Sequence, residues 1–403
     1  MKLFRFSLPL FMALLLLFAC TVPPVIEDDS DVEIDVFGLY PAGNDEFTVL
    51  YGKYQYDQET WSYLDSLIFL RVDSSGTILD TNGQYYENRP YIREQYLLDD
   101  GNIMLFGNLN SDIYSWYYTT AVYTPDGTLV WTLPMADRTN GVIPASDGGL
   151  FVLGWDQTVE NYDIITYSRT DAAGDTLWSK SVNTYSYNAS LRSGTTTTDG
   201  GCVATGGIYV QDRSSDILVA KINSSGDTLW TNTFGGDRRD YVSFVEELSD
   251  GSILVVGELN VYDSTNANWG LNSGEQVYLI KISASGETLW TKAYGNTLRE
   301  TANGFIELSD GSLILLGKRS QSYVYLFDTT QGWVSKLSAG GEEIWLKEFD
   351  RKLPVGVREA SNGDILVVTN NLDSDYDWNN ANDMNLMKFT SSGTLIWDKT
   401  LTP

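Results

Sequence analysis

A phrase that returns seven times limits the folds open to this chain more than any other feature. Each copy holds two or three small residues, a glycine, three more residues and then usually tryptophan. The glycines are Gly76, Gly127, Gly174, Gly226, Gly286, Gly341 and Gly393. The tryptophans are Trp131, Trp178, Trp230, Trp290, Trp345 and Trp397. A residue that recurs at the same position of the repeats has a role common to the units, such as packing against the neighbouring unit. We therefore expect these tryptophans to be structural.

A second phrase precedes each copy of the first. It consists of an Asp-Gly or Asn-Gly pair, a β-branched apolar run and a closing glycine, as in SDGSILVVG from Ser249 and SDGSLILLG from Ser309. Asp-Gly between apolar runs is a strong signal of a tight hairpin turn. One unit therefore predicts four antiparallel strands, A to D, in which the second phrase joins A to B and the first joins C to D.

Seven such units predict an all-β fold, a seven-bladed β-propeller with four antiparallel strands per blade. They fill residues 33–403 at about 53 residues each, near the repeat length of known propellers. Radial closure protects strand edges that an open row would expose. A β-solenoid is the main rival, but its coils are usually shorter and lack two hairpin turns per unit. We expect the first and last blades to pack together without sharing a strand.

The N-terminus has the features of an export signal. Lys2 and Arg5 precede an apolar run over residues 6–18, which is too short for the roughly 20 residues of a membrane-spanning helix. The stretch ending at Cys20 resembles a bacterial lipobox, which implies lipidation of that cysteine. We therefore expect a signal peptide over 1–19, an acidic lipid-anchored linker over 20–32 and the propeller over 33–403. The alternative is an ordinary signal peptide with an incidental cysteine.

Composition excludes several classes of function. The chain has 26 basic and 54 acidic residues, and loss of Lys2 and Arg5 with the leader takes its net charge from −28 to −30. Nucleic acid is therefore not an expected partner, and we expect membrane contact only through the lipid anchor. Histidine is absent, which excludes catalytic and zinc sites built on imidazole.

The glycine and tryptophan phrase resembles the tryptophan-docking repeat of PQQ-type propellers. That resemblance implies that each tryptophan packs on the neighbouring blade. Quinone-dependent members of the family have an adjacent cysteine pair, whereas the second cysteine of this chain, Cys202, has no cysteine neighbour. We therefore expect no cofactor, and we expect Cys202 to be a buried residue in strand B of the fourth blade.

Arginine concentrates where D–A loops are expected, on the face that also carries the B–C loops. The eight residues are Arg89, Arg93, Arg138, Arg192, Arg238, Arg239, Arg299 and Arg351. Around the mouth of a central channel they would attract a carboxylate, a phosphate or an acidic peptide. The alternative, which we favour, is ion pairing with neighbouring acids such as Asp137, Asp240 and Glu300.

The B–C loops are expected to be aromatic and polar. We expect Trp116, Trp269, Trp333 and Trp378 to bind a sugar or protein there, although they could instead cover strand ends. Asp373, Asp375 and Asp377 alternate like the start of a calcium loop. Trp378 and Met384 then occupy the positions of the required Gly and Glu, so we expect no metal site.

These features favour a lipid-anchored, monomeric, non-catalytic propeller of the bacterial cell envelope, with outer-membrane sorting implied by Thr21. It would bind a protein or glycan through its B–C and D–A loops. One alternative is an outer-membrane assembly scaffold lipoprotein, a family that the chain resembles in size, lipobox and repeat, but which has eight blades. Another is a glycosidase or lyase that uses two carboxylates.

Overall fold

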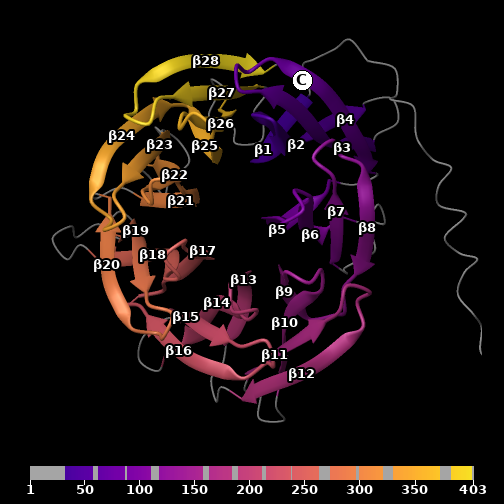
Figure 1. Cartoon of the computed structure of the whole chain (residues 1–403), viewed down its shortest axis with the longest axis vertical. Coiled ribbons are helices and arrows are strands. Elements are labelled where there is room, and N and C mark those ends of the chain that lie inside the picture. The colour runs from indigo at the N-terminus through magenta and orange to yellow at the C-terminus, as the bar shows by residue number, and fades with distance from the viewer. Residues whose placement is uncertain are drawn as a thin grey trace, which may run out of the picture. The chain divides into compact units, whose positions relative to one another are not determined.

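A computed structural model describes residues 32–57, 62–86, 89–109, 118–157, 163–183, 189–210, 215–236, 238–262, 273–295, 299–320, 330–372 and 383–401. It confirms a seven-bladed β-propeller, in which seven four-stranded antiparallel sheets are arranged around a common axis (Figure 1). Consecutive strands pair with one another in every blade. The described residues contain no helix long and apolar enough to cross a membrane.

Each blade uses four consecutive strands as A, B, C and D. The first four blades consist of β1 (Val32–Gly43), β2 (Glu46–Asp57), β3 (Ser62–Asp73) and β4 (Ile78–Tyr86); β5 (Tyr91–Leu97), β6 (Ile103–Asn108), β7 (Thr119–Tyr123) and β8 (Leu129–Pro134); β9 (Thr139–Pro144), β10 (Leu150–Gln157), β11 (Asp163–Thr170) and β12 (Thr176–Asn183); and β13 (Ser190–Thr196), β14 (Cys202–Tyr209), β15 (Ser215–Ile222) and β16 (Thr228–Phe234). The last three consist of β17 (Tyr241–Glu247), β18 (Ile253–Tyr262), β19 (Ser273–Ile282) and β20 (Thr288–Tyr294); β21 (Arg299–Glu307), β22 (Leu313–Ser320), β23 (Gln331–Leu337) and β24 (Glu343–Asp350); and β25 (Lys352–Glu359), β26 (Ile365–Asn371), β27 (Met384–Phe389) and β28 (Leu395–Leu401).

The six repeated tryptophans lie in the outermost strands, and five of them contact the C–D turn of the next blade. Trp230 is representative: its ring lies against Gly286, and its Nε1 donates a hydrogen bond of 3.0 Å to the carbonyl of Ala284. A Cβ on Gly286 would come within 2.8 Å of the Trp230 ring. The same contact joins Trp178 to Gly226, Trp290 to Gly341, Trp345 to Gly393 and Trp397 to Gly76. Glycine is therefore required at the turn because the ring occupies the space of a side chain.

Two blades replace this tryptophan contact. Blade 1 has no tryptophan in β4, and Phe69 of β3 lies against Gly127 instead. In blade 2 the residue against Gly174 is Leu133, while Trp131 packs into the core beside it. For Trp131, the expected stacking on the glycine of the next blade is therefore replaced by a contact from two residues further along β8.

The ring closes as expected, by contacts between complete first and last blades. Trp397 of β28 lies against Gly76 of the β3–β4 turn, and Lys399 donates a hydrogen bond of 2.6 Å to the Ser75 carbonyl. Nearer the axis, the Val36 amide donates to Asn370 Oδ1 at 2.8 Å. Every strand of β25–β28 comes from the C-terminal repeat, so no strand is exchanged between the termini.

The basic residue of strand C has a structural role in most blades. Lys281 of β19 is 7 % exposed, and its Nζ lies 2.8 Å from Asp250 in the Asp-Gly turn of the same blade. Lys221 and Lys336 pair in the same way with Asp199 and Asp310. Each pair fixes the A–B turn to strand C, which explains why this basic residue recurs at one phase.

Candidate functional site

The innermost strands share a local irregularity. Every A strand contains a β-bulge, and in each we consider the first residue along the strand that is left without a partner in strand B. We call these seven residues the bulge ring: Phe37, Arg93, Asn140, Arg192, Ser243, Asn303 and Val355. Because the A strands surround the axis (Figure 1), the ring places one residue from each blade around that axis.

The closing glycine of the second repeated phrase permits this bulge. A Cβ on Gly206 would come within 1.8 Å of the Ser190 carbonyl, and one on Gly107 within 1.9 Å of the Tyr91 carbonyl. Both carbonyls belong to the residue two positions before the bulge. In blades 2 to 7 the bulge residue precedes the last position of the phrase by fourteen residues, as Arg192 precedes Gly206. This constant spacing is a sequence signal for the ring, and the expectations drawn from the two phrases overlooked it.

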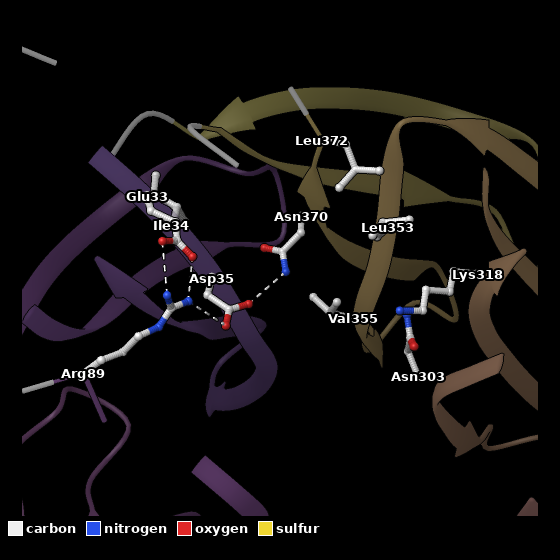
Figure 2. A pocket seen from close by; sticks show the side chains of 10 residues that line it. All are labelled: Glu33, Ile34, Asp35, Arg89, Asn303, Lys318, Leu353, Val355, Asn370 and Leu372. Carbon is white, nitrogen blue, oxygen red and sulfur yellow. Dashed lines mark hydrogen bonds and ion pairs between the residues drawn. The ribbon is translucent and has the colours of Figure 1, made fainter. Parts of the chain in front are cut away.

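One side of the axial region is electrically neutralised. A cavity of about 330 Å³ lies among blades 1, 6 and 7 (Figure 2), and two bulge-ring residues, Asn303 and Val355, line it. Arg89 reaches into it and pairs with Glu33 at 2.6 Å and Asp35 at 3.8 Å. Burial raises the pKa of Asp35, while Arg89 opposes that shift. The positive charge of Arg89 is thus already compensated on this side.

The bulge ring also supplies two arginines, from blades 2 and 4. β5 and β13 approach each other at Gly141 of β9, whose Cβ position lies 1.9 Å from the Arg192 carbonyl oxygen and 3.1 Å from Oε1 of Glu94, the neighbour of Arg93. Arg239 lies in the β16–β17 loop, which leads into β17, an A strand in contact with β13. In agreement with this arrangement, burial and then the charges of Arg93 and Arg239 lower the pKa of Arg192. We call Arg93, Arg192 and Arg239 the arginine cluster. Within the described part of the chain, none of the three forms an ion pair with a carboxylate.

Neutral groups hold the cluster in place. The Arg93 guanidinium lies 5.5 Å from the centre of the Tyr118 ring, and that of Arg239 lies 5.0 Å from the centre of the Tyr241 ring. Arg192 donates a hydrogen bond of 2.9 Å from Nε to Ser190 Oγ, so its two terminal nitrogens face no carboxylate among the described residues. These contacts restrict the side chains and leave their positive charge intact.

The acid next to the cluster is held in its neutral form. Glu94 follows Arg93 in β5, accepts a hydrogen bond of 3.2 Å from the Val142 amide, and contacts the hydroxyl of Tyr96 at 3.2 Å. Burial raises the pKa of Glu94 to about 8, against the opposing effects of these hydrogen bonds and of Arg93. At neutral pH this carboxyl group is therefore mostly protonated and adds little negative charge beside Arg93.

The expected D–A arginines separate into loop and strand positions. Arg89, Arg138, Arg238, Arg239 and Arg351 lie in D–A loops. The placement of the other three was wrong: Arg93, Arg192 and Arg299 lie in A strands, because those strands begin earlier than the repeat phrase indicates. Arg138 pairs with Asp156 and lies over Trp155. Arg238, Arg299 and Arg351 also have interaction partners.

The expected position of Trp333 was wrong. It lies in β23, the C strand of blade 6, and is 5 % exposed within the core shared with blade 5. The strand begins two residues before it, so the side chain faces apolar neighbours instead of a loop surface. Trp116, Trp269, Trp378, Cys20, Asp373, Asp375 and Asp377 lie outside the described residues.

The second cysteine lies where the repeats indicated. Cys202 is fully buried in β14, the B strand of blade 4, and burial raises the pKa of its thiol to about 12. No cluster of three or more potential metal ligands occurs among the described residues.

Comparison with known proteins adds fold-level likeness only. No family model matches the chain, and no curated protein sequence matches it. The β-propeller domain of the Trilobed protease from Pyrococcus furiosus is similar over 92 % of this chain and 96 % of that one, with 10 % identity and a TM-score of 0.49. An apocarotenoid oxygenase variant from Synechocystis covers 92 % and 89 % respectively, with 8 % identity and a TM-score of 0.46. The Dos1 propeller covers 83 % and 89 %, with 10 % identity and a TM-score of 0.45. Likeness at this level carries no conclusion about activity.

Proposed function

We propose that this protein is a non-catalytic binding propeller that takes a protein or glycan on the face formed by its B–C and D–A loops. The observation that carries the proposal is the bulge ring. Its position is common to all blades, yet it holds Phe, Arg, Asn, Ser and Val, whereas the positions that pack the blades repeat the same residue. Phe37 and Val355 pack against core clusters, and Asn303 donates a hydrogen bond to the Pro354 carbonyl of the next blade, so part of the ring serves packing. The variation that suits recognition of an asymmetric ligand is that of the other polar positions, Arg93, Asn140, Arg192 and Ser243.

A glycan array and a panel of immobilised acidic peptides test this proposal. Wild-type protein should bind a defined subset of them, and the double variant Arg192→Gln/Arg239→Gln should lose that binding. A matched control is Lys180→Gln/Lys292→Gln, which removes the same charge from outer strands where Lys180 pairs with Asp227 and Lys292 with Glu342. Equal loss in both double variants would contradict use of the loop face.

The proposal includes attachment to a bacterial envelope membrane through Cys20. Residues 21–32 would span at most about 40 Å at roughly 3.3–3.6 Å per residue, so partners would lie near the membrane surface. Wild-type protein should incorporate radiolabelled palmitate, and Cys20→Ala should not. Unlabelled wild-type protein would exclude the anchor. An assembly scaffold for outer-membrane proteins is a second binding role, but seven blades differ from the eight of the family it resembles.

A carboxylate-dependent glycosidase or lyase is the candidate from another class. Glu33 and Asp35 line the cavity in Figure 2. Burial raises the pKa of Asp35, as the role of a general acid requires, and Glu33 forms an ion pair with Arg89. This candidate is weaker because Arg89 and Asn370 already occupy the Asp35 carboxylate. Release of reducing sugar by wild type, abolished in Asp35→Asn, would establish it.

A further inference from the structure

The arginine cluster differs from Arg89 and Arg138 in having no ion pair with a carboxylate among the described residues. Arg89 and Arg138 each form an ion pair, with Glu33 and Asp156. Arg93, Arg192 and Arg239 are instead held by tyrosine rings and a serine hydroxyl. Burial, and then the positive charges of Arg93 and Arg239, lower the pKa of Arg192, so an anion bound among these side chains would offset the repulsion that Arg192 experiences.

We propose that Arg93, Arg192 and Arg239 form a binding site for the oxyanion group of the ligand, a carboxylate, sulfate or phosphate. The terminal nitrogens of a guanidinium group match two oxygens of such a group in a bidentate hydrogen-bonded pair. The Nε of Arg192 is bonded to Ser190. This side chain is therefore fixed at its base while its terminal nitrogens remain able to donate.

The overall negative charge of the protein limits where an anion can bind. A chain of net charge −28 repels anions at long range, so an anion would bind only where positive charge is concentrated and unscreened by nearby acids. The protonated Glu94 preserves that condition at neutral pH. Phe37, Asn140 and Ser243 of the bulge ring carry no charge, so the ring places positive charge on one side of the axis.

This inference rests on the proposed function for its biological ligand, but small anions test it independently. Sodium sulfate, sodium phosphate and sodium galacturonate would each be titrated calorimetrically into the protein, with sodium chloride at matched ionic strength as the blank. Wild type should bind at least one of the three in the millimolar range, and the one preferred identifies the chemical source of the group. Arg192→Gln and Arg239→Gln should each weaken that binding at least about tenfold.

Arg138→Gln is the matched control, because Arg138 lies on the same face but is paired with Asp156. It should change the affinity less than about twofold. No binding of any of the three ions to wild type would overturn the inference, as would equal weakening by Arg138→Gln. An array positive only for neutral glycans would overturn it while leaving the proposed function standing. Sulfate binding by wild type, together with no binding to any glycan or peptide of the arrays, would support the anion site and contradict the proposed function.

Discussion

Replacing a glycine of the C–D turn with alanine tests whether tryptophan docking joins the blades. Gly286 has φ = +93°, and a Cβ there would lie 2.8 Å from Cγ of Trp230, at the base of the indole where rotation gives no relief. Gly251, in an A–B turn, has φ = +78° with no heavy atom within 4 Å of its Cβ position. The two substitutions therefore share the backbone strain and differ in the contact.

The backbone strain of an alanine at positive φ costs about 1–2 kcal/mol. Overpacking against a fixed ring adds roughly 1–3 kcal/mol. We therefore expect Gly286→Ala to lower the free energy of unfolding by about 2–5 kcal/mol and Gly251→Ala by about 1–2 kcal/mol. Urea denaturation followed by tryptophan fluorescence and by circular dichroism measures both. Equal destabilisation by the two variants would refute docking of Trp230 on Gly286 as the contact that joins these blades.

Three further predictions concern ionisable groups in the blades. The pKa of Glu94 is about 8 in the folded protein against an ordinary value of 4.5, so the folded state holds the proton more tightly than the unfolded state. The free energy of unfolding should therefore fall by on the order of 2–4 kcal/mol as the pH rises from about 5 to 8. Thermal melts across this range should show that fall in wild type, and Glu94→Gln should remove it. Asp250→Asn, which leaves the Lys281 ammonium buried without its carboxylate, should destabilise by about 2–3 kcal/mol, whereas Lys281→Met should cost less than about 1 kcal/mol because Asp250 is solvent-exposed; the reverse order in urea titrations would disprove this asymmetry. Cys202 should resist maleimide labelling in the folded protein and react on unfolding, so rapid native labelling would contradict its burial.

The repeats predicted the blade architecture because their constant residues make the same packing contacts in every unit. The glycine of each C–D turn and the Asp-Gly of most A–B turns mark strand ends through short-range backbone requirements that a single sequence displays. Strand C was harder to place: Trp333 was assigned to a loop among polar residues, whereas pairing with β22 and β24 extends the strand past it.

The site was only partly predictable for a similar reason. Arginine was correctly located near the axis, but which arginines are neutralised depends on contacts between residues distant in sequence. Arg89 meets Glu33 across 56 positions, while Arg93, four residues later, donates a hydrogen bond to the neutral Tyr118 hydroxyl. Local acids such as Asp137 suggested pairing for all of them. The bulge that brings Arg93 and Arg192 to the axis arises from strand register, which composition alone does not indicate.

Hydrogen–deuterium exchange with a saturating ligand from the array tests the binding face most directly, since it reports which backbone segments the ligand protects. We expect protection in peptides that contain Arg93, Arg192 and Arg239, at the start of β5, β13 and β17, with the A–B turns unchanged. Protection confined to the A–B and C–D turns, such as those at Gly251 and Gly286, would place binding on the opposite face and contradict the proposed function.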